Sequence, residues 1–412
     1  MTDTIVLGAG IVGVCVAIHL QRRGRSVLLV DRREPGRETS YGNAGIIQRE
    51  AVRPRAFPRE LAELFRIGMK QGLDTRYDLS ALPGLASPLF RYWWNSAPAR
   101  YRRIAAEYAT LIAHSISEHA DLIAAAGAGS LIEKRGFLLL FRSAARRDAT
   151  FADAAGDKRD FGVNSTELDG PALARLEPAL RIPMAGALHW TDPWTVRDPG
   201  GLVAAYAELF RSLGGAFATG DAGTLESTGS GWRVQTSAGP AESAEAVLAL
   251  GPWAAAATRR LGYRFPLFAK RGYHREYAQA AGTLDRPVLD TEMGYLLAPM
   301  RRGIRLTTGA EFARLDAPPN LTQIEGAEAV ARQLVDLGDR LDPAPWLGAR
   351  PATPDMKPVI GPAPAHHNLW FAFGHAHQGL TLGPATGRLL AEQITGETPF
   401  LDATPFSPAR FM

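Results

Sequence analysis

The chain has 412 residues, 46% hydrophobic and 21% charged, enough for a sizeable core in two domains or in one domain with a large insertion. Its 46 basic and 42 acidic residues leave a net charge of +4, and no basic run with interleaved aromatic residues argues for nucleic-acid binding. The single cysteine, Cys15, excludes a disulfide within the chain, and no apolar run reaches the roughly 18 residues of a transmembrane helix.

The first predicted element is a strand from residue 4 that ends in the turn Gly8-Ala9-Gly10-Ile11-Val12-Gly13. Gly8 permits the tight turn, Gly10 lets the backbone approach a pyrophosphate, and Gly13 lets the following helix lie close to the strand. A second strand over 26–31 completes a dinucleotide-binding pattern. Because the pattern begins at residue 4, it leaves no room for a signal peptide, and we expect a cytoplasmic protein.

The residues around this turn favour FAD or NAD over NADP. The helix that begins at Ile11 and Val12 offers free N–H groups and a partial positive charge to phosphates. Asp31 ends the second strand, where a carboxylate can accept hydrogen bonds from ribose hydroxyls, and Arg32 follows it. An acid in place of an arginine at the strand end disfavours a 2′-phosphate.

Hydrophobic periodicity predicts the elements that follow. Residues 54–125 are predicted to be helical, and their aromatic stretch 90–94 is expected to lie in the core, with a pocket wall as the alternative. The other predictions are strands over 137–141, 216–218, 232–236, 246–251 and 368–373, helices over 199–213, 322–337 and 384–394, and an antiparallel sheet over 263–315.

Three distant segments together resemble the FAD-dependent D-amino-acid oxidase and glycine oxidase family. They are 8–45, the strand 246–253 ending in Gly-x-Trp, and 348–384 with Arg-Pro-x-Thr-x-Asp followed by Gly-His. The similarity is greatest to its bacterial D-amino-acid dehydrogenase branch, which includes D-hydroxyproline-type members. The third segment is more specific than the glycines alone, and the resemblance favours FAD over NAD.

The predicted fold class is α/β, with a Rossmann-like FAD-binding domain that is interrupted along the chain. Its pieces are 1–50, 160–255 and 345–412. An α+β substrate-binding domain, built on an antiparallel sheet, is assembled from 51–159 and 256–344.

The resemblance implies a set of residues around the flavin. Ser40, Asn43, Ala44 and Gly45 belong to a loop of small residues beside the ring, where Ser40 can bond a phosphate or ribitol oxygen and Asn43 is expected to face its reactive side. Gly251 and Trp253 follow the central strand. Gly374 opens a loop that ends at a helix N-terminus, where the amides of Gly379, Leu380 and Thr381 would stabilise the negative charge of reduced flavin.

The resemblance also implies a substrate clamp. Arg350 is expected to bind an amino-acid carboxylate, because arginine is a planar bidentate donor that stays charged; the alternative is a surface salt bridge. Tyr295 resembles a family tyrosine that shares this carboxylate. His377 replaces a second arginine of glycine oxidase relatives and could bind the carboxylate or a polar substrate side chain. No metal site is expected, since His375 and His377 lack other ligands at defined spacing.

The resemblance implies oxidation of a D-amino acid or cyclic secondary amino acid, with a hydride moving from Cα to flavin N5. No side-chain base is required. The electron acceptor is a quinone or oxygen. One alternative is an oxygen-using oxidase of glycine or sarcosine, and another is a flavin-binding assembly protein without catalysis. The amphipathic segment 57–69, with basic residues along it, predicts either a helix packed on the substrate domain or peripheral membrane contact.

Overall fold

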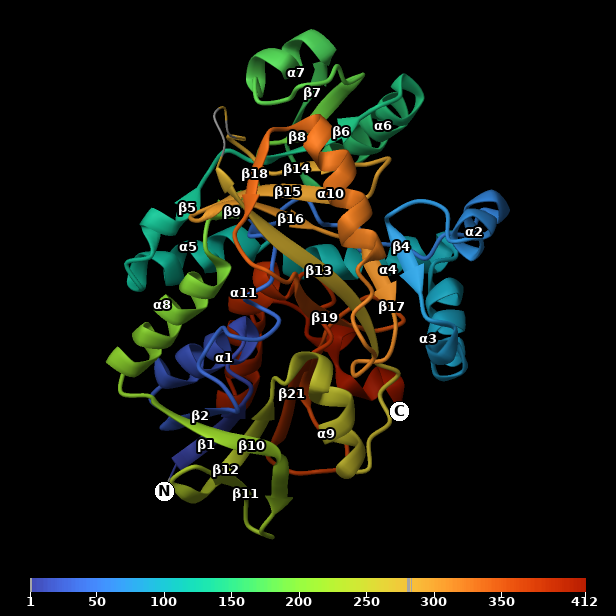
Figure 1. The fold of residues 1–412 in the computed structure, drawn as a ribbon. Helices are drawn as coiled ribbons and strands as arrows, with labels where there is room; N and C mark the ends of the chain where they lie inside the picture. Colours follow the sequence, from blue (N-terminus) through green and yellow to red (C-terminus); the bar gives the residue numbers. More distant parts are fainter. Residues whose placement is uncertain (1, 280–281, 283) are drawn as a thin grey trace.

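The computed structural model describes residues 2–279, 282 and 284–412, which are built around two large sheets (Figure 1). The first sheet is the dinucleotide-binding one. Strand β1 lies between β2 and β12 and is parallel to both, and β12 is parallel to β21. Its strands are β1 (Thr2–Leu7), β2 (Val27–Asp31), β10 (Ala216–Ser227), β11 (Trp232–Thr236), β12 (Gly239–Leu248), β20 (Val359–Pro362) and β21 (Leu369–Phe373).

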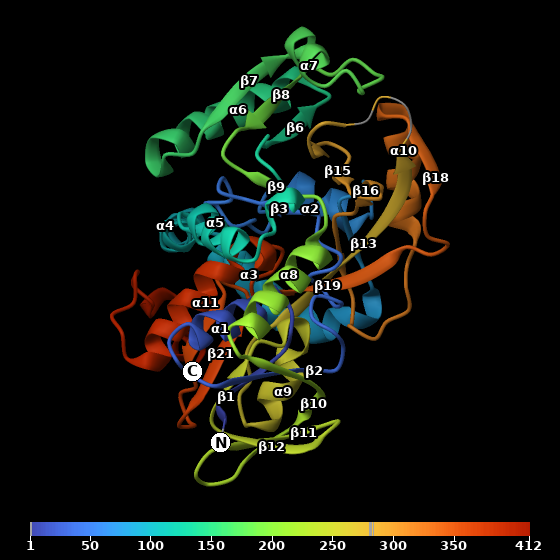
Figure 2. The same ribbon diagram turned by 90° about the vertical axis from the view of Figure 1, so that its left-hand side faces the viewer.

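Three helices cover one face of the first sheet. Helix α1 (Ile11–Gln21) packs against α8 (Pro199–Ser212) and α11 (Gly379–Thr395), as Figures 1 and 2 show. Asp198 caps α8 by accepting a hydrogen bond from the Gly201 amide (2.8 Å). A separate apolar cluster that includes Trp232, Phe265 and Phe371 packs on strands of this sheet, near α9 (Ala254–Arg260). Because apolar residues pack on both faces of this sheet, the sequences of its central strands are continuous apolar runs.

The second sheet is largely antiparallel and is organised around the long strand β13 (Phe268–Gln279), which pairs with β16 (Gly303–Thr307), β17 (Ala310–Phe312), β18 (Leu337–Arg340) and β19 (Trp346–Ala352). Its other strands are β4 (Thr75–Tyr77), β6 (Phe137–Phe141), β7 (Ser165–Asp169), β8 (Gly186–Trp190), β14 (Val288–Asp290) and β15 (Tyr295–Met300). Helix α10 (Thr322–Leu334) contributes to its core. The two sheets and their helices confirm the predicted fold class.

Further helices from the first half of the chain surround the two sheets. They are α2 (Leu61–Gly68), α3 (Leu82–Asn95), α4 (Pro98–Ile112), α5 (Ser115–Ala125), α6 (Ala144–Phe161) and α7 (Gly170–Leu176). A small third sheet is formed by β3 (Ile46–Ile47), β9 (Trp194–Val196) and β5 (Ile132–Glu133), in that order. Within the described residues, no helix is both long and apolar enough to cross a bilayer.

The chain departs from the sequence predictions at several elements. Helix α11 begins at Gly379, five residues before the predicted start at Pro384. Pro384 lacks the N–H that would bond the Leu380 carbonyl, and this carbonyl instead accepts a hydrogen bond from His119 Nε2 of α5 (2.7 Å). Strand β10 continues to Ser227, well past the short strand predicted over 216–218.

The aromatic stretch of α3 is also unlike its prediction. Tyr92 is buried, but Phe90 and Trp94 are 61% and 48% exposed, so the expectation of a core element is wrong for these two side chains. The division into domains stays a prediction. Strand pairing differs from the predicted division in one place. Strands β7 and β8 pair with β6 in the second sheet, whereas the predicted boundary at residue 160 assigned them to the FAD-binding domain.

Candidate active site

One cavity of about 1730 Å³ is lined by residues from both sheets. Its volume exceeds the ~300–1,000 Å³ of a typical small-ligand pocket, so it has room for a large cofactor and a second small molecule. The glycine turn after β1 forms part of one end, and β13, β16 and β19 contribute to another.

At the first end, the turn after β1 brings the N-terminus of α1 to the cavity. Gly8 has φ +105°, and a Cβ there would lie 2.5 Å from the Ala249 carbonyl oxygen. A Cβ on Gly13 would lie 1.8 Å from the Gly8 carbonyl oxygen, so only glycine lets α1 pack this closely on the strand. The first amide of the helix, that of Ile11, donates to Ser40 Oγ (3.0 Å).

Asp31 lies beside this turn at the end of β2. Its Oδ2 accepts a hydrogen bond from the Ala9 amide (2.6 Å). Burial raises the pKa of this carboxyl, and the hydrogen bonds from the backbone amides of Ala9 and Arg33 oppose that shift. The neighbouring Arg32 stacks over the Trp253 ring, 4.3 Å from its centroid, which joins β2 to the segment after β12.

Helices α1 and α11 are packed so that both N-termini face the cavity. A Cβ on Gly383 would lie 2.8 Å from Ile11, and one on Gly387 would lie 2.6 Å from the Cys15 backbone. The two contacts advance in the same direction, so the helices are parallel, and α11 begins one turn further toward the cavity, or ~6 Å. The positive ends of two helix dipoles therefore meet in this site.

The loop over 39–45 is fixed between the two sheets. Arg305 of β16 donates to the backbone carbonyls of Tyr41 (2.9 Å) and Asn43 (2.6 Å), while a buried ion pair with Glu276 (2.6 Å) holds its guanidinium. Asn43 Oδ1 accepts from the Gly45 amide (2.8 Å). Gly42 has no room for a side chain, because a Cβ would lie 1.9 Å from the ring of Trp346.

The other end of the cavity is strongly cationic. Lys270 of β13 and Arg350 of β19 are direct cross-strand partners. Arg350 donates from Nη1 to the Gly309 carbonyl (2.8 Å) and from Nη2 to the Thr308 carbonyl (3.2 Å), and Lys270 Nζ donates to the Tyr92 hydroxyl (3.0 Å). Among the described residues, no carboxylate lies within 4.0 Å of Lys270, Arg350 or the nearby Arg55.

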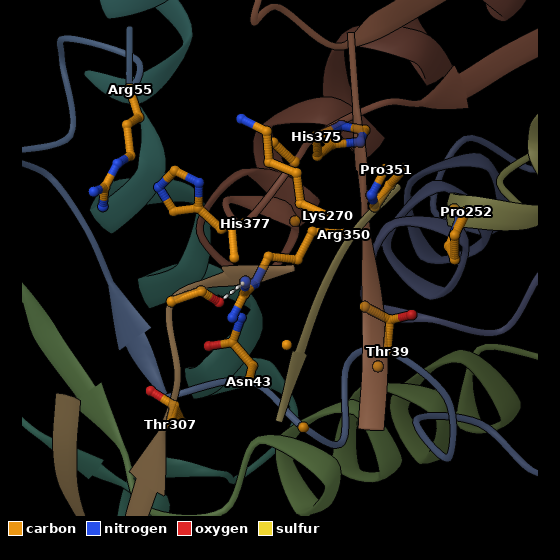
Figure 3. A pocket seen from close by; sticks show the side chains of 18 of the residues that line it. Thr39, Asn43, Arg55, Pro252, Lys270, Thr307, Arg350, Pro351, His375 and His377 are labelled. Carbon is orange, nitrogen blue, oxygen red and sulfur yellow. Dashed lines mark hydrogen bonds between the residues drawn. The ribbon is translucent and has the colours of Figure 1, made fainter. Parts of the chain in front are cut away.

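Burial and mutual repulsion affect the ionisation of this cluster. Burial, followed by the charge of Arg55, lowers the pKa of Arg350 to about 10. The pKa of Lys270 is lowered to about 7 by burial and then by Arg55 and Arg350. His377, which faces the cavity beside them (Figure 3), has its pKa lowered well below its usual range by burial and by all three cations, so its ring is neutral.

A family model, FAD dependent oxidoreductase, matches residues 3–393. The chain belongs to this family. It is 31% identical to a D-amino-acid oxidase of Bradyrhizobium diazoefficiens, over 99% of this chain and 98% of that protein. It is 30% identical to a D-amino acid dehydrogenase of Chromohalobacter salexigens, over 99% of both. It also resembles a glycine oxidase structure from Geobacillus kaustophilus, with a TM-score of 0.77, 21% identity, and coverage of 100% of this chain and 99% of that one.

The family resemblance inferred from the motifs is thus confirmed, and the protein is an FAD-dependent oxidoreductase. The cavity fits this cofactor on three counts. Gly8 and Gly10 bring side-chain-free backbone to the cavity beside the start of α1, Asp31 adds a carboxylate that ribose hydroxyls could donate to, and the N-terminus of α11 lines the cavity as well. In α11 the first intrahelical bond runs from the Leu382 amide to the Gln378 carbonyl, so the amides of Gly379, Leu380 and Thr381 precede it.

Most of the predicted site residues line the cavity, and their roles stay predictions. These residues are Gly8, Gly10, Ile11, Val12, Asp31, Arg32, Ser40, Asn43, Ala44, Gly251, Trp253, Arg350, His377, Gly379 and Leu380.

Four other predicted residues lie just behind the lining of the described part of the cavity. They are Gly13, described above, Gly45, Gly374 and Thr381. Gly45 and Gly374 have φ values of +73° and +84°, which glycine adopts without strain. Thr381 Oγ1 accepts from the Gln48 amide (3.2 Å) and donates to the Ile46 carbonyl (3.3 Å), so its hydroxyl fixes α11 to β3.

Tyr295 is a predicted site residue that does not line the cavity. Tyr295 is only 1% exposed and belongs to the core cluster of the second sheet with Leu297, while the intervening Leu296 lines the cavity. Its direct cross-strand partner, Asp290, does line the cavity, so the contact of Tyr295 with a substrate carboxylate stays a prediction. Tyr92 of α3 does line the cavity, where its hydroxyl accepts a hydrogen bond from Lys270 Nζ.

The sequence interpretation missed Lys270, Arg55 and Tyr92 as site residues. Lys270 had a readable signal: it lies two positions after Phe268 and two before Gly272 in an alternating strand, so it shares their face. Its pairing with Arg350 joins strands about 80 residues apart and has no local signal. Tyr92 was part of the aromatic stretch for which a pocket wall was the alternative, and that alternative holds for this residue.

Proposed function

We propose that this enzyme oxidises the Cα of a D-amino acid or of a cyclic secondary amino acid. The observation that carries the proposal is Arg350, a guanidinium without a carboxylate partner among the described residues, in the same cavity as the two helix N-termini. A substrate carboxylate would supply the missing counter-charge. The two curated relatives above, by name a D-amino-acid oxidase and a D-amino acid dehydrogenase, support this substrate class.

Arg350 retains enough donors to bind such a carboxylate. Each terminal nitrogen has two N–H groups and uses one of them on a backbone carbonyl, of Gly309 or Thr308. One N–H on each remains free, which permits a two-bond contact with a carboxylate. The carbonyls also orient the guanidinium plane, so the carboxylate and with it Cα are bound in one orientation.

The charges of the cluster also act on the substrate amine. Lys270, Arg55 and Arg350 disfavour a further positive charge, so they favour the neutral amine over the ammonium form. When bound, FAD accepts the hydride that leaves Cα. The neutral His377 and the protein wall exclude water around the amine, and no side-chain base is needed once the amine is neutral.

The test is an anaerobic screen in which bleaching of the flavin absorbance is recorded. D-amino acids, D-hydroxyprolines, glycine and sarcosine are added to the holoenzyme, with the L-enantiomers as matched controls. We expect at least one D- or cyclic secondary amino acid to bleach the flavin within seconds. Bleaching by glycine or sarcosine alone would favour the oxygen-using amine oxidase instead, and no bleaching by any of them would contradict the proposal.

We further propose that the enzyme contacts a membrane surface through α2 and α3. Leu61 and Phe65 of α2 are 83% and 66% exposed, and α2 has no buried residue. Arg59 joins the two helices: its guanidinium lies 4.2 Å over the Trp93 ring and donates to the Trp93 carbonyl (2.7 Å). Exposed apolar and cationic side chains on one surface fit an anionic lipid layer.

The same surface supports a quinone as the electron acceptor. Leu64 and Ile67 of α2 line the cavity, so a quinone in a membrane that contacts this helix would be close to the cavity wall. Sedimentation with phosphatidylglycerol vesicles should carry the enzyme down, and the double variant F65S/F90S should stay in solution. Leu213→Ser, at an exposed leucine after α8, is the control. Peroxide formation without reduction of a quinone analogue would contradict the acceptor assignment.

A further inference from the structure

We propose that Lys270 and Arg55 form a second anion subsite beside Arg350, and that the preferred substrate is therefore an amino acid with a carboxylate side chain. This inference rests on the proposed function and specifies its substrate class. It starts from a charge count. One α-carboxylate needs one cation, and Arg350 provides it, yet two more cations face the same part of the cavity (Figure 3).

The like-charged pair has a cost that a second anion would remove. Lys270 and Arg350 are directly opposite across β13 and β19, and like charges at such positions are destabilising. A buried lysine elsewhere in the chain, Lys357, shows the usual arrangement, with Glu107 as its ion-pair partner. Two partly buried cations without a counter-charge in a cavity therefore point to a site that binds an anion.

The side chains of Lys270 and Arg350 are anchored at different points of the cavity. Arg350 is held by the carbonyls of Thr308 and Gly309, between β16 and β17. Lys270 Nζ is held on the opposite side, by the Tyr92 hydroxyl of α3, which itself donates to the Arg55 carbonyl. Because their anchors diverge, the two groups suit two carboxylates of one small molecule better than a single one.

The acidic residues of this region do not neutralise the subsite. Arg55 helps to lower the pKa of the Asp74 carboxyl, but this carboxylate is already bound to Arg66 (2.9 Å). Glu63 binds the same arginine (2.6 Å). The rings of Tyr92 and Phe268, 4.2 and 5.5 Å from Lys270 Nζ, give it cation–π contacts but no counter-charge. A side-chain carboxylate of the substrate would therefore be the first anion at this position.

The binding test uses inert acids and needs no turnover. Succinate and butyrate have the same chain length and differ by one carboxylate, and their affinity for the holoenzyme is measured by calorimetry. We expect succinate to bind at least about tenfold more tightly, a factor that corresponds to ~1.4 kcal/mol. Lys270→Met should bring succinate to the affinity of butyrate, while Arg350→Met should weaken both. Lys158→Met, at an exposed lysine of α6, is the control.

Two results would overturn the subsite. Equal affinities of succinate and butyrate in the unaltered enzyme would show that only one carboxylate is bound. Equal weakening of both acids by Lys270→Met would place Lys270 at the α-carboxylate with Arg350. Because Lys270 is partly buried, Arg55→Met at an exposed arginine serves as a second variant, with the same expected selective loss of succinate.

Turnover then separates this inference from the proposed function. D-glutamate and D-glutamine are nearly isosteric, and we expect kcat/KM to favour D-glutamate by at least tenfold, with D-aspartate over D-asparagine as the shorter pair. If no amino acid bleaches the flavin, the proposed function fails while a succinate preference still stands. If amino acids are oxidised without preference for the acidic member of either pair, the proposed function stands and the subsite is wrong.

Discussion

Arg350 illustrates how a single charge defines the site. Its guanidinium is oriented by two backbone carbonyls and has no carboxylate partner within the described residues. Loss of a buried charged contact costs ~2–5 kcal/mol, so Arg350→Ala should raise the substrate KM by about 30-fold to 5000-fold. Arg350→Lys retains a charge but not the planar fork and should recover part of the loss. An unchanged KM in steady-state assays of Arg350→Ala would contradict the clamp.

Lys270 gives the site a dependence on pH. Its lowered pKa of about 7 means that the free enzyme loses this charge as the pH rises through neutrality. The groups that face it are Arg55, Arg350, His377 and the Tyr92 hydroxyl. KM for D-glutamate should therefore rise up to tenfold per pH unit above about 7, relative to D-glutamine, which shares the same titrating amine. Parallel pH profiles for both substrates would contradict this assignment.

Tyr295 provides the opposite test. Its hydroxyl is buried in the core of the second sheet without a hydrogen-bond partner among the described residues. Removal of an unsatisfied buried hydroxyl is neutral or stabilising, so Tyr295→Phe should leave KM within about twofold and should not lower the thermal midpoint. A large rise in KM would contradict this expectation and support the predicted contact of Tyr295 with the substrate carboxylate.

The residues that the sequence could predict are those with a local pattern. Gly8, Gly10 and Asp31 lie within one strand–turn–helix–strand unit, so their spacing fixes their placement at one edge of a sheet. The position of Tyr295 relative to the cavity could not be predicted, because the face of a strand residue changes with a shift of one position, which the sequence does not fix. The pairing of Lys270 with Arg350 depends on strand register between distant segments, and no local pattern encodes it.

At the level of elements, close helix packing determines where the two helix N-termini lie. Gly13 lets α1 approach β1, and Gly383 and Gly387 let α11 approach α1. The sequence located both helices but placed the start of α11 at Pro384, because a proline usually marks the first turn. The compensating hydrogen bond from His119 to the Leu380 carbonyl comes from a helix 260 residues away and could not be predicted.

Gly13→Ala tests this packing. The new Cβ would lie 1.8 Å from the Gly8 carbonyl oxygen, so α1 must move away from the strand. We expect a loss of at least about 3 kcal/mol in the free energy of unfolding and a lower FAD content in the purified protein. Gly84→Ala in α3, where no atom lies within 4 Å of the new Cβ, should instead stabilise by about 0.5–1 kcal/mol. Equal thermal midpoints of the two variants would contradict the packing argument.

At the scale of the whole molecule, the cofactor should connect the two sheets. The cavity is lined by the turn after β1 and the N-terminus of α11 on one side and by β13 and β19 on the other. A ligand that binds only the folded state adds RT ln(1 + [L]/Kd), about 2.7 kcal/mol at a hundredfold excess over Kd. The apoenzyme should therefore unfold at a lower temperature than the holoenzyme, and its midpoint should rise with added FAD in differential scanning fluorimetry. AMP, which lacks the flavin, should raise the unfolding midpoint of the apoenzyme less than FAD does. An equal rise with AMP would mean that the stabilising contacts are all at the adenosine end, and it would contradict the connection between the sheets.

The uncompensated pair Lys270 and Arg350 has a practical consequence for anyone who handles this enzyme. Two adjacent cations in a cavity will attract whatever small polyanion the solution supplies. Citrate, malonate or sulfate in a crystallisation drop or an assay buffer would then act as competitive inhibitors and as stabilisers at once. Kinetic constants measured in such buffers would understate the affinity for substrate, and thermal midpoints would overstate the stability of the free enzyme.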